Sequence, residues 1–200
     1  MRKKMKGLLV ISAVLILTVL VCGGCGKASK TLSEEEIAAF NTEFFNSGTH
    51  NMNNMLLSSE YGKPEEIDLF ELFYGGMGQW GQESEEELAL LVELDSDAAY
   101  LDVVKVTSGE MDAFLRENLG IGLEETQKTG LDSFYYLEDY DSYYLVTGDT
   151  NFKWCNVVSG TWEGKDQLTL EYEKEDEEGR WQVTLRKTDE GYLFVSNRKA

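Results

Sequence analysis

The chain has 200 residues, and its 37 acidic and 18 basic side chains give a formal net charge of −19 at pH 7. Nucleic-acid phosphates and anionic headgroups attract cationic surfaces, so this balance argues against nucleic acid as a partner and against a basic helix lying on a membrane. A single histidine, His50, cannot supply a multi-histidine zinc site, and we expect neither a cofactor nor a resident metal.

Residues 1–24 have the three-part layout of a secretory signal. A short basic head is followed by an apolar run over residues 8–22 and by two glycines. The apolar run has about fifteen residues, whereas a helix that spans a bilayer needs roughly 20. A permanent transmembrane helix is therefore disfavoured, although an uncleaved signal anchor is the alternative.

The CGGC stretch that ends at Cys25 resembles the lipobox of bacterial lipoproteins, in which a cysteine after small residues receives a lipid before the signal is removed. The resemblance implies lipid attachment at Cys25 and a position on the extracytoplasmic face of the cell membrane. Residues 25–31 then form a lipid-attached linker. Removing the four basic residues of the signal leaves 14 basic against 37 acidic side chains, a formal charge of −23.

The first part of the remaining chain, residues 32–130, carries helix signals. Three Ser or Thr residues stand three positions before a Glu, which is the pattern of a capping box at a helix N-terminus. These pairs are Ser33 with Glu36, Ser84 with Glu87, and Thr107 with Glu110. Pro64 predicts the start of another helix that ends near Gly75, and Gly120 predicts a C-terminal cap. Residues 101–106 are apolar and β-branched and predict a strand within this part.

The second part, residues 131–200, changes to a period of two. Apolar side chains alternate with polar ones over 168–172 and 181–185, which predicts strands with one buried and one solvated face. Residues 143–147 and 154–162 predict two further strands, joined by a turn at 148–151. We therefore predict a single α+β domain over 32–200, with N-terminal helices packed on a C-terminal antiparallel β-meander of four to five strands.

Cys155 is the only cysteine after Cys25, so no disulfide can form within the domain. Because it lies in the middle of a predicted strand, we expect a buried and unreactive thiol. Gly76 to Gly81 match the spacing of a dinucleotide-binding loop, but the segment before them carries helix signals. We interpret this stretch as a loop between helices.

Four strings of the chain carry a resemblance to other proteins: NTEFFN (41–46), IDLFELFY (67–74), LEETQKTGLDSFYYLEDYDSYY (123–144) and FVSN (194–197). In this order after a lipobox, they resemble a group of uncharacterised lipoproteins from Gram-positive, Firmicutes-type gut bacteria. The resemblance implies an extracytoplasmic lipoprotein and assigns no activity.

The densest aromatic stretch lies between Phe134 and Tyr144. It predicts either the seam between helices and sheet or a ligand surface, because aromatic faces beside carboxylates are typical of sugar and peptide sites. The residues of that surface would be Tyr140, Asp141, Tyr143 and Tyr144. We expect a non-catalytic binding or accessory module with a protein or glycan ligand. The alternative is an extracytoplasmic hydrolase of wall or dietary glycans that uses paired carboxylates such as Asp139 and Asp141.

Overall fold

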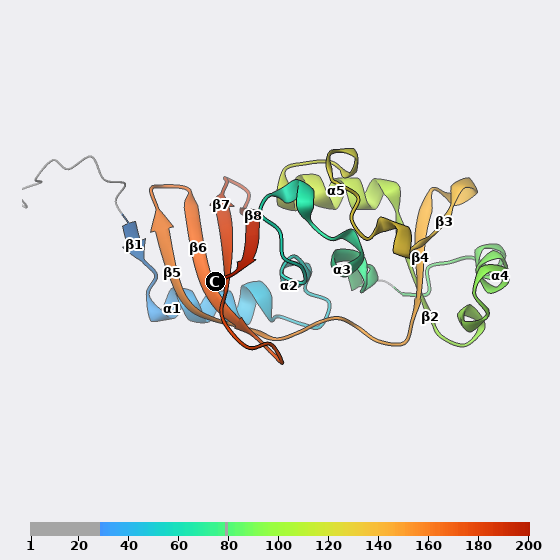
Figure 1. Ribbon diagram of the computed structural model, residues 1–200, viewed down its shortest axis with the longest axis horizontal. Coiled ribbons are helices and arrows are strands. Elements are labelled where there is room, and N and C mark those ends of the chain that lie inside the picture. Colours follow the sequence, from blue (N-terminus) through green and yellow to red (C-terminus); the bar gives the residue numbers. More distant parts are fainter. Residues whose placement is uncertain (1–28, 79) are drawn as a thin grey trace, which may run out of the picture.

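The computed structural model describes residues 29–78 and 80–200 (Figure 1). The signal segment, Cys25 and the first residues of the predicted linker lie outside these ranges. The chain folds as the predicted α+β protein, with a five-stranded antiparallel sheet and a three-stranded antiparallel sheet. The larger sheet has the order β1-β5-β6-β7-β8, and the smaller has the order β2-β4-β3.

The larger sheet, sheet A, is the predicted meander with one strand added at its edge. Its strands are β1 (Ser29–Thr31), β5 (Cys155–Glu163), β6 (Gln167–Lys174), β7 (Trp181–Lys187) and β8 (Tyr192–Lys199). The alternating residues of β6 and β7 put Leu168, Leu170, Val183 and Leu185 on one face, all of them fully buried. Their neighbours face solvent, so the predicted division into a buried and a solvated face is confirmed.

β1 lies within the segment that the sequence suggests as a linker. Ser29–Thr31 pair with the last residues of β5, in the register Lys30 to Trp162. The pairing continues one residue beyond β1, where the backbone N–H of Leu32 donates to the carbonyl oxygen of Gly160 at 2.9 Å. A Cβ at position 160 would lie 2.5 Å from the Leu32 side chain and 2.7 Å from that of Leu170, so a larger residue here would force these leucines to shift.

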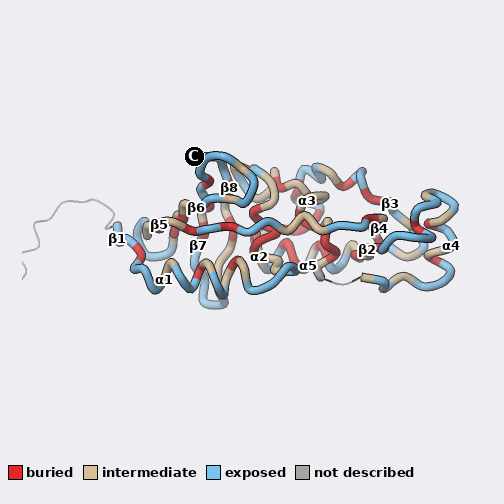
Figure 2. Tube along the Cα trace, turned by 90° about the horizontal axis from the view of Figure 1, so that it is seen from below, coloured by how far each residue is buried: buried red, intermediate tan, exposed pale blue. Residues whose placement is uncertain are grey.

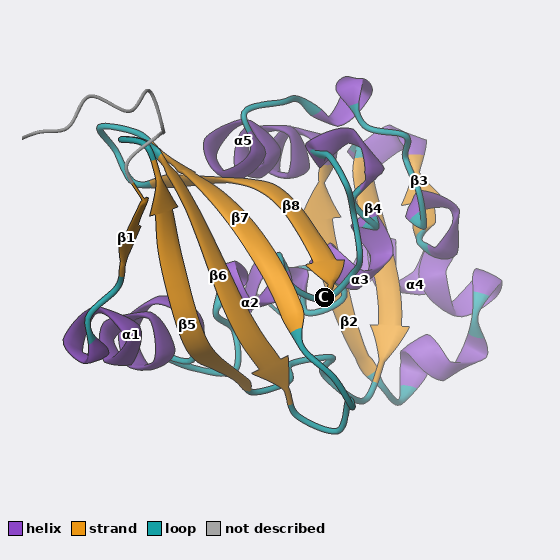
Figure 3. Ribbon diagram, turned by 60° about the vertical axis from the view of Figure 1, so that its left-hand side comes forward, coloured by secondary structure: helices purple, strands orange, loops and turns teal. Residues whose placement is uncertain are grey.

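The smaller sheet, sheet B, consists of β2 (Asp102–Thr107), β3 (Tyr135–Leu137) and β4 (Ser142–Thr147). We expected the segment at 143–147 to adjoin the strand at 154–162, but β4 pairs instead with β2, in the register Val104 to Leu145. The connection over 148–154 is an extended segment rather than a tight turn, and it carries the chain from one sheet to the other (Figure 3). The β2 and β4 strands are both apolar enough to be buried on two faces, and this favours their pairing.

Helical segments fill the space between and around the two sheets. The α-helices are α1 (Glu34–Ala39), α2 (Met52–Met55), α3 (Leu69–Phe73), α4 (Glu85–Leu94) and α5 (Ser108–Leu119). A π-helical turn, η1 (Phe40–Phe45), continues α1. Short 3-10 turns are η2 (Pro64–Glu66), η3 (Gly76–Gly78), η4 (Ser96–Ala99), η5 (Leu123–Glu125), η6 (Leu131–Ser133) and η7 (Glu138–Tyr140).

All three predicted capping boxes are confirmed, at the first residues of α1, α4 and α5. Gly120 ends α5 in the left-handed conformation, with φ of 74°, as a C-terminal glycine should. The single helix expected from Pro64 to Gly75 is wrong. Pro64 opens only a 3-10 turn, and Asp68 then caps α3 by accepting hydrogen bonds from the N–H groups of Phe70 and Glu71. The cap of α3 interrupts the predicted helix because Asp68, as an N-cap residue, adopts extended backbone angles.

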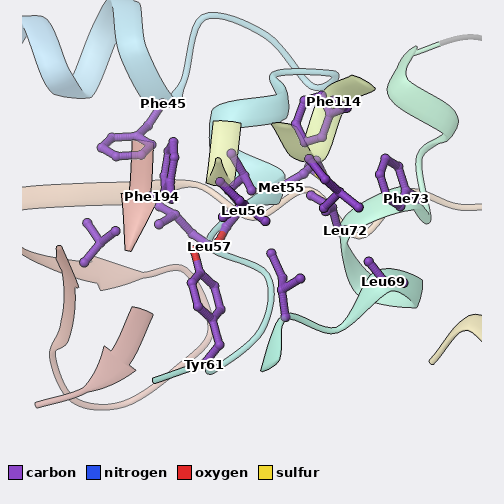
Figure 4. Packing of buried hydrophobic residues seen from close by; sticks show 14 of the residues in the cluster. Phe45, Met55, Leu56, Leu57, Tyr61, Leu69, Leu72, Phe73, Phe114 and Phe194 are labelled. Atoms are coloured by element: carbon purple, nitrogen blue, oxygen red, sulfur yellow. Dashed lines mark hydrogen bonds between the residues drawn. The ribbon is translucent and has the colours of Figure 1, made fainter. Parts of the chain in front are cut away.

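One large core joins both sheets. Leucine, phenylalanine and methionine side chains from α2, α3 and α5 meet those of β8 and the 56–61 segment in it, as Figure 4 shows. A second, smaller core lies on the other face of sheet B, beneath α4. It contains Leu91, Ala98, Val103 and Tyr144. Sheet B is therefore buried on both faces, whereas one face of sheet A is open, and the burial along the chain reflects this (Figure 2).

Candidate functional site

Tyr144 does not share a surface with the other three residues of the predicted ligand surface. Tyr143 and Tyr144 are neighbours in β4 and therefore point to opposite faces of sheet B. Tyr144 is fully buried in the smaller core, so its place in a ligand surface is a wrong prediction. Tyr143 is half-buried, and its ring lies 4.7 Å from that of Tyr136 between centroids. The alternative prediction, that this stretch forms a seam between helices and sheet, agrees with the packing of Tyr143 and Tyr144.

Asp141 occupies the tight turn before β4 in a left-handed conformation, with φ of 44°. Its carboxylate accepts a hydrogen bond of 2.9 Å from the hydroxyl of Tyr136. Hydrogen bonds from Ser108 and Tyr136 lower the pKa of Asp141. A general acid for glycoside cleavage needs a raised pKa, so the lowered pKa of Asp141 does not suit that role. Its hydrogen bond with Tyr136 instead stabilises the turn.

Glu87 is the centre of a buried polar network. The sequence predicted its part in the capping box of α4 but not its contacts with sheet B. One oxygen accepts from the backbone N–H of Ser84 at 2.6 Å, and the other lies 2.5 Å from the Lys105 ammonium and accepts from the Tyr144 hydroxyl. Burial opposes the charged form, but the hydrogen bonds from Lys105, Tyr144 and Ser84 prevail and lower the pKa of Glu87 to about 2. The network holds α4 on sheet B.

Cys155 lies in β5 and is only 6 % exposed. Its burial raises the pKa of the thiol to about 12, against smaller opposing effects of Asn46 and Lys174. The predicted burial of this cysteine is confirmed, and a thiol with this pKa holds almost no thiolate at neutral pH. The small polar hollow beside it, about 50 Å³, has room for ordered water only.

His50 is exposed and lies in a loop, as the sequence indicates. It lines an open hollow of about 310 Å³ together with Trp80, Asp102 and Asp149. Its imidazole ring lies 6.3 Å from the Trp80 ring between centroids. The carboxylates and the imidazole make no hydrogen bonds with one another among the residues described, so this hollow has no preformed catalytic pair.

An aromatic groove is the site with the most binding character. It runs between the α1–η1 helix and sheet A, at the last residues of β5 and the first residue of β8, and it encloses about 320 Å³. Its lining residues are Leu32, Glu36, Ala39, Phe40, Glu43, Phe44, Trp162 and Tyr192. Three of the four rings, those of Phe44, Trp162 and Tyr192, are half-buried and so present part of their faces to solvent.

The π-helical turn positions two of these rings by anchoring itself to the edge of β5. The Asn41 side chain exchanges two hydrogen bonds with the backbone of Val157, of 3.0 and 2.6 Å. Asn46 exchanges two with the backbone of Cys155, of 2.8 and 3.2 Å. These amides take the place of a neighbouring strand, because they pair with backbone N–H and C=O groups on the edge of β5. The turn between them is thereby held against the sheet.

The rings of the groove support one another. Tyr192 stands edge-on to Phe44 at 5.5 Å between centroids, and it lies 5.8 Å from Phe40 and 6.5 Å from Trp162. Such pairs contribute about 0.5–1.5 kcal/mol each beyond the area they bury. A ligand that enters the groove thus meets preorganised rings and needs to order few side chains.

Beyond the Phe44–Tyr192 pair the groove continues into a polar hollow of about 560 Å³. Both rings line both hollows. The polar hollow lies between α5 and the turn that joins β7 to β8, and its walls carry amides, carboxylates and one guanidinium group. These polar side chains are Asn53, Arg116, Glu117, Asn118, Thr188, Asp189 and Glu190.

Carboxylates and cations both flank the groove. Glu36 and Glu43 line the apolar part, while Lys187 stands with its ammonium 5.8 Å from the Trp162 ring centroid. The pKa of Glu36 is lowered by its hydrogen bonds with the backbone and hydroxyl of Ser33, so this carboxylate stays ionised. A glycan or peptide would find aromatic faces at one end and hydrogen-bonding groups at the other.

The comparison with known proteins adds nothing to this geometry. No family model, no curated protein and no solved structure matches the chain. The groove must therefore be judged by its own chemistry. Sequence reasoning missed it because Phe40 and Phe44 have the spacing of an ordinary core stripe, and Trp162 and Tyr192 lie far away in the sequence.

One further sequence expectation can be placed. The glycine-rich stretch follows α3, a helix, and so lacks the strand that a dinucleotide site needs. Over residues 29–78 and 80–200, no group of three or more His, Cys, Asp or Glu side chains is arranged to hold a metal ion. Within the same ranges, no helix has the length and apolar character needed to cross a bilayer.

Proposed function

We propose that this protein is a lipoprotein held at the extracytoplasmic face of the cell membrane through Cys25, and that its domain is a non-catalytic module that binds a glycan segment in the aromatic groove. The observation that carries the binding proposal is the groove itself. Half-buried rings from two distant parts of the chain, Phe44 and the pair Trp162 and Tyr192, form its walls and lead into a polar hollow.

An uncharged glycan fits the chemistry of both parts. Sugar rings pack their apolar C–H faces on aromatic side chains, while their hydroxyl groups exchange hydrogen bonds with amides and carboxylates. Asn53 and Asn118 offer amides in the polar part, and Glu36 and Glu43 offer carboxylates at the apolar end. An anionic ligand would meet repulsion from the net negative charge of the chain.

The hydrolase alternative lacks comparable support. Glu36 and Glu43 lie on one wall of the groove, and seven residues of helix separate them by roughly 10 Å. Glycosidases place two carboxyl groups on either side of the bond, about 5–9.5 Å apart, and keep one of them protonated. The pKa of Glu36 is lowered, which is the wrong direction for that acid.

Titration of the purified chain with neutral oligosaccharides tests the proposal. The probes are the tetramers of N-acetylglucosamine, glucose and mannose, and binding is followed by calorimetry. We expect one of them to bind with a Kd between about 1 μM and 1 mM. Trp162→Ala should weaken that binding about tenfold or more, because it removes the largest ring of the groove.

Trp154→Ala is the matched control, because Trp154 is a similarly large ring that is 54 % exposed and does not line the groove. It should leave binding unchanged. Equal losses in both variants, or no binding of any probe, would argue against the groove as a glycan site. Release of reducing sugar that is abolished by Glu36→Gln or Glu43→Gln would favour the hydrolase.

A further inference from the structure

A second surface lies at the other end of the molecule, around α4. Six large apolar side chains of the described part of the chain are exposed, and four of them fall within a segment of twelve residues. These four are Leu90 at 41 %, Leu94 at 57 %, Tyr100 at 87 % and Leu101 at 45 % exposure. We call the segment 83–102, which contains α4 and η4, the α4 end.

Helix geometry explains how these leucines remain uncovered. Leu91 points at sheet B and is fully buried in the smaller core. Leu90 and Leu94 are four residues apart and so lie one above the other on α4, where their side chains are 41 % and 57 % exposed. The two leucines form an apolar stripe on the outer side of α4. Grouped apolar exposure of this kind marks interaction sites more often than single exposed residues do.

The charge of the α4 end is extreme. Residues 83–102 contain eight acidic side chains and no lysine or arginine. The acids are Glu83, Glu85, Glu86, Glu87, Glu93, Asp95, Asp97 and Asp102. Among the residues that the structure describes, only Glu87 of this set has an ion pair, with Lys105. The other seven carboxylates of the α4 end have no ion pair among the described residues.

We infer that the α4 end docks a cationic amphipathic segment of a partner protein, one that has an apolar stripe fringed by lysine or arginine. Such a segment would cover Leu90 and Leu94 with its own apolar side chains and pair its cations with the surrounding carboxylates. A second copy of this chain would place two acidic segments against each other, and an anionic bilayer would be repelled in the same way.

The position of this surface sets it apart from the groove. β1 and α4 lie at opposite ends of the longest axis of the molecule (Figure 1). Leu32 and Trp162 of the groove lie next to β1, since Leu32 follows that strand and Trp162 pairs with it. The two surfaces can therefore be occupied at once, and the inference about the α4 end does not depend on the proposed glycan site.

Fluorescence anisotropy with labelled peptides tests the inference, using the full chain with Cys25→Ala so that no lipid is attached. The probe is a leucine–lysine peptide whose leucines recur at helical spacing. A scrambled peptide of the same composition separates amphipathic docking from plain charge attraction. We expect the amphipathic peptide to bind at least about tenfold more tightly than the scrambled one, because burying two leucine side chains supplies that factor.

The double variant Leu90→Ser, Leu94→Ser should lose this preference, whereas Trp154→Ser, which removes an exposed ring elsewhere, should keep it. Leu94→Ser alone is a milder variant whose side chain is mostly exposed, so it should fold normally and weaken binding by an intermediate factor. Equal binding of the two peptides, or unchanged binding by the double variant, would overturn the inference. So would a dimer or binding to anionic phosphatidylglycerol vesicles that depends on Leu90 and Leu94.

Discussion

At the scale of single residues, Glu87 shows how one side chain can serve two levels of structure. It closes the capping box of α4 with Ser84 and also receives the Lys105 ammonium and the Tyr144 hydroxyl from sheet B. Its side chain is only 3 % exposed. A buried carboxylate is tolerated here because each of its oxygens accepts a hydrogen bond, and because one of the donors, the Lys105 ammonium, is charged.

Glu87→Gln should lower the free energy of unfolding by on the order of 3 kcal/mol at neutral pH, because it leaves the Lys105 ammonium without its counter-charge. Urea unfolding measures the difference. The folded pKa of Glu87, about 2, lies below the ordinary glutamate value of 4.5. Its stabilisation is therefore present above pH 4.5 and is lost as the pH falls toward about 2, so the difference between wild type and variant should shrink over that range.

Glu93→Gln is the control for this variant, because Glu93 lies on the same helix and is exposed. It should change stability by less than about 0.5 kcal/mol. A loss in Glu87→Gln that is equally small, or one that does not depend on pH between 4.5 and about 2, would contradict the assigned role of the network.

At the scale of elements, the helix boundaries follow local chemistry. Thr107 is the last residue of β2 and also the N-cap of α5. Its hydroxyl oxygen accepts from the N–H of Glu110 at 3.1 Å, and the Glu110 carboxylate accepts from the N–H of Thr107 at 2.8 Å. The strand can thus turn into a helix without a loop. This matters because α5 reaches from β2 to β8 and joins the two sheets.

Thr107→Ala should therefore lower the free energy of unfolding by about 1 kcal/mol, the usual cost of losing an N-cap. Thermal unfolding monitored by circular dichroism provides the measurement. Thr129→Ala removes an exposed hydroxyl outside any helix cap and should have little effect. If both variants melt together with the wild type, the capping box contributes nothing to stability.

At the scale of the whole molecule, the proposed anchor and the two candidate surfaces form a simple arrangement. Four Cα steps separate Cys25 from Ser29, the first residue of β1, and they span at most about 15 Å. If Cys25 carries the lipid, the groove beside β1 is kept near the membrane, and the α4 end faces away from it (Figure 1). A module of this shape would hold one ligand near the surface and present another face outward.

Cys25→Ala should release the protein from the membrane fraction, because a single acylated cysteine is the proposed attachment. Metabolic labelling with a palmitate analogue should also disappear from this variant. Cys22→Ala is the control, since Cys22 stands in the same segment but follows a bulky valine, and it should keep the label. Label that persists in Cys25→Ala would refute the anchor proposal.

The sequence by itself determined the α+β class, the three helix caps, the alternation in β6 and β7, and the burial of Cys155. These features depend on residues within about four positions of one another or on a strict period of apolar residues, so they can be predicted from the sequence without knowledge of the tertiary structure. The linker boundary was less accurate, because the pairing of Ser29–Thr31 with β5 depends on residues more than a hundred positions away.

Only the tertiary structure decided which strands share a sheet and which side chains share a site. β4 could pair with β5 or with β2 on local evidence, and the two-sided burial of sheet B selected β2. The same choice buried Tyr144 and separated it from Tyr143, which removed Tyr144 from the predicted ligand surface. The aromatic groove arose where η1 was pinned to β5 by Asn41 and Asn46, bringing Phe44 to Tyr192. Contacts over such separations follow from packing the whole core, and no local pattern encodes them.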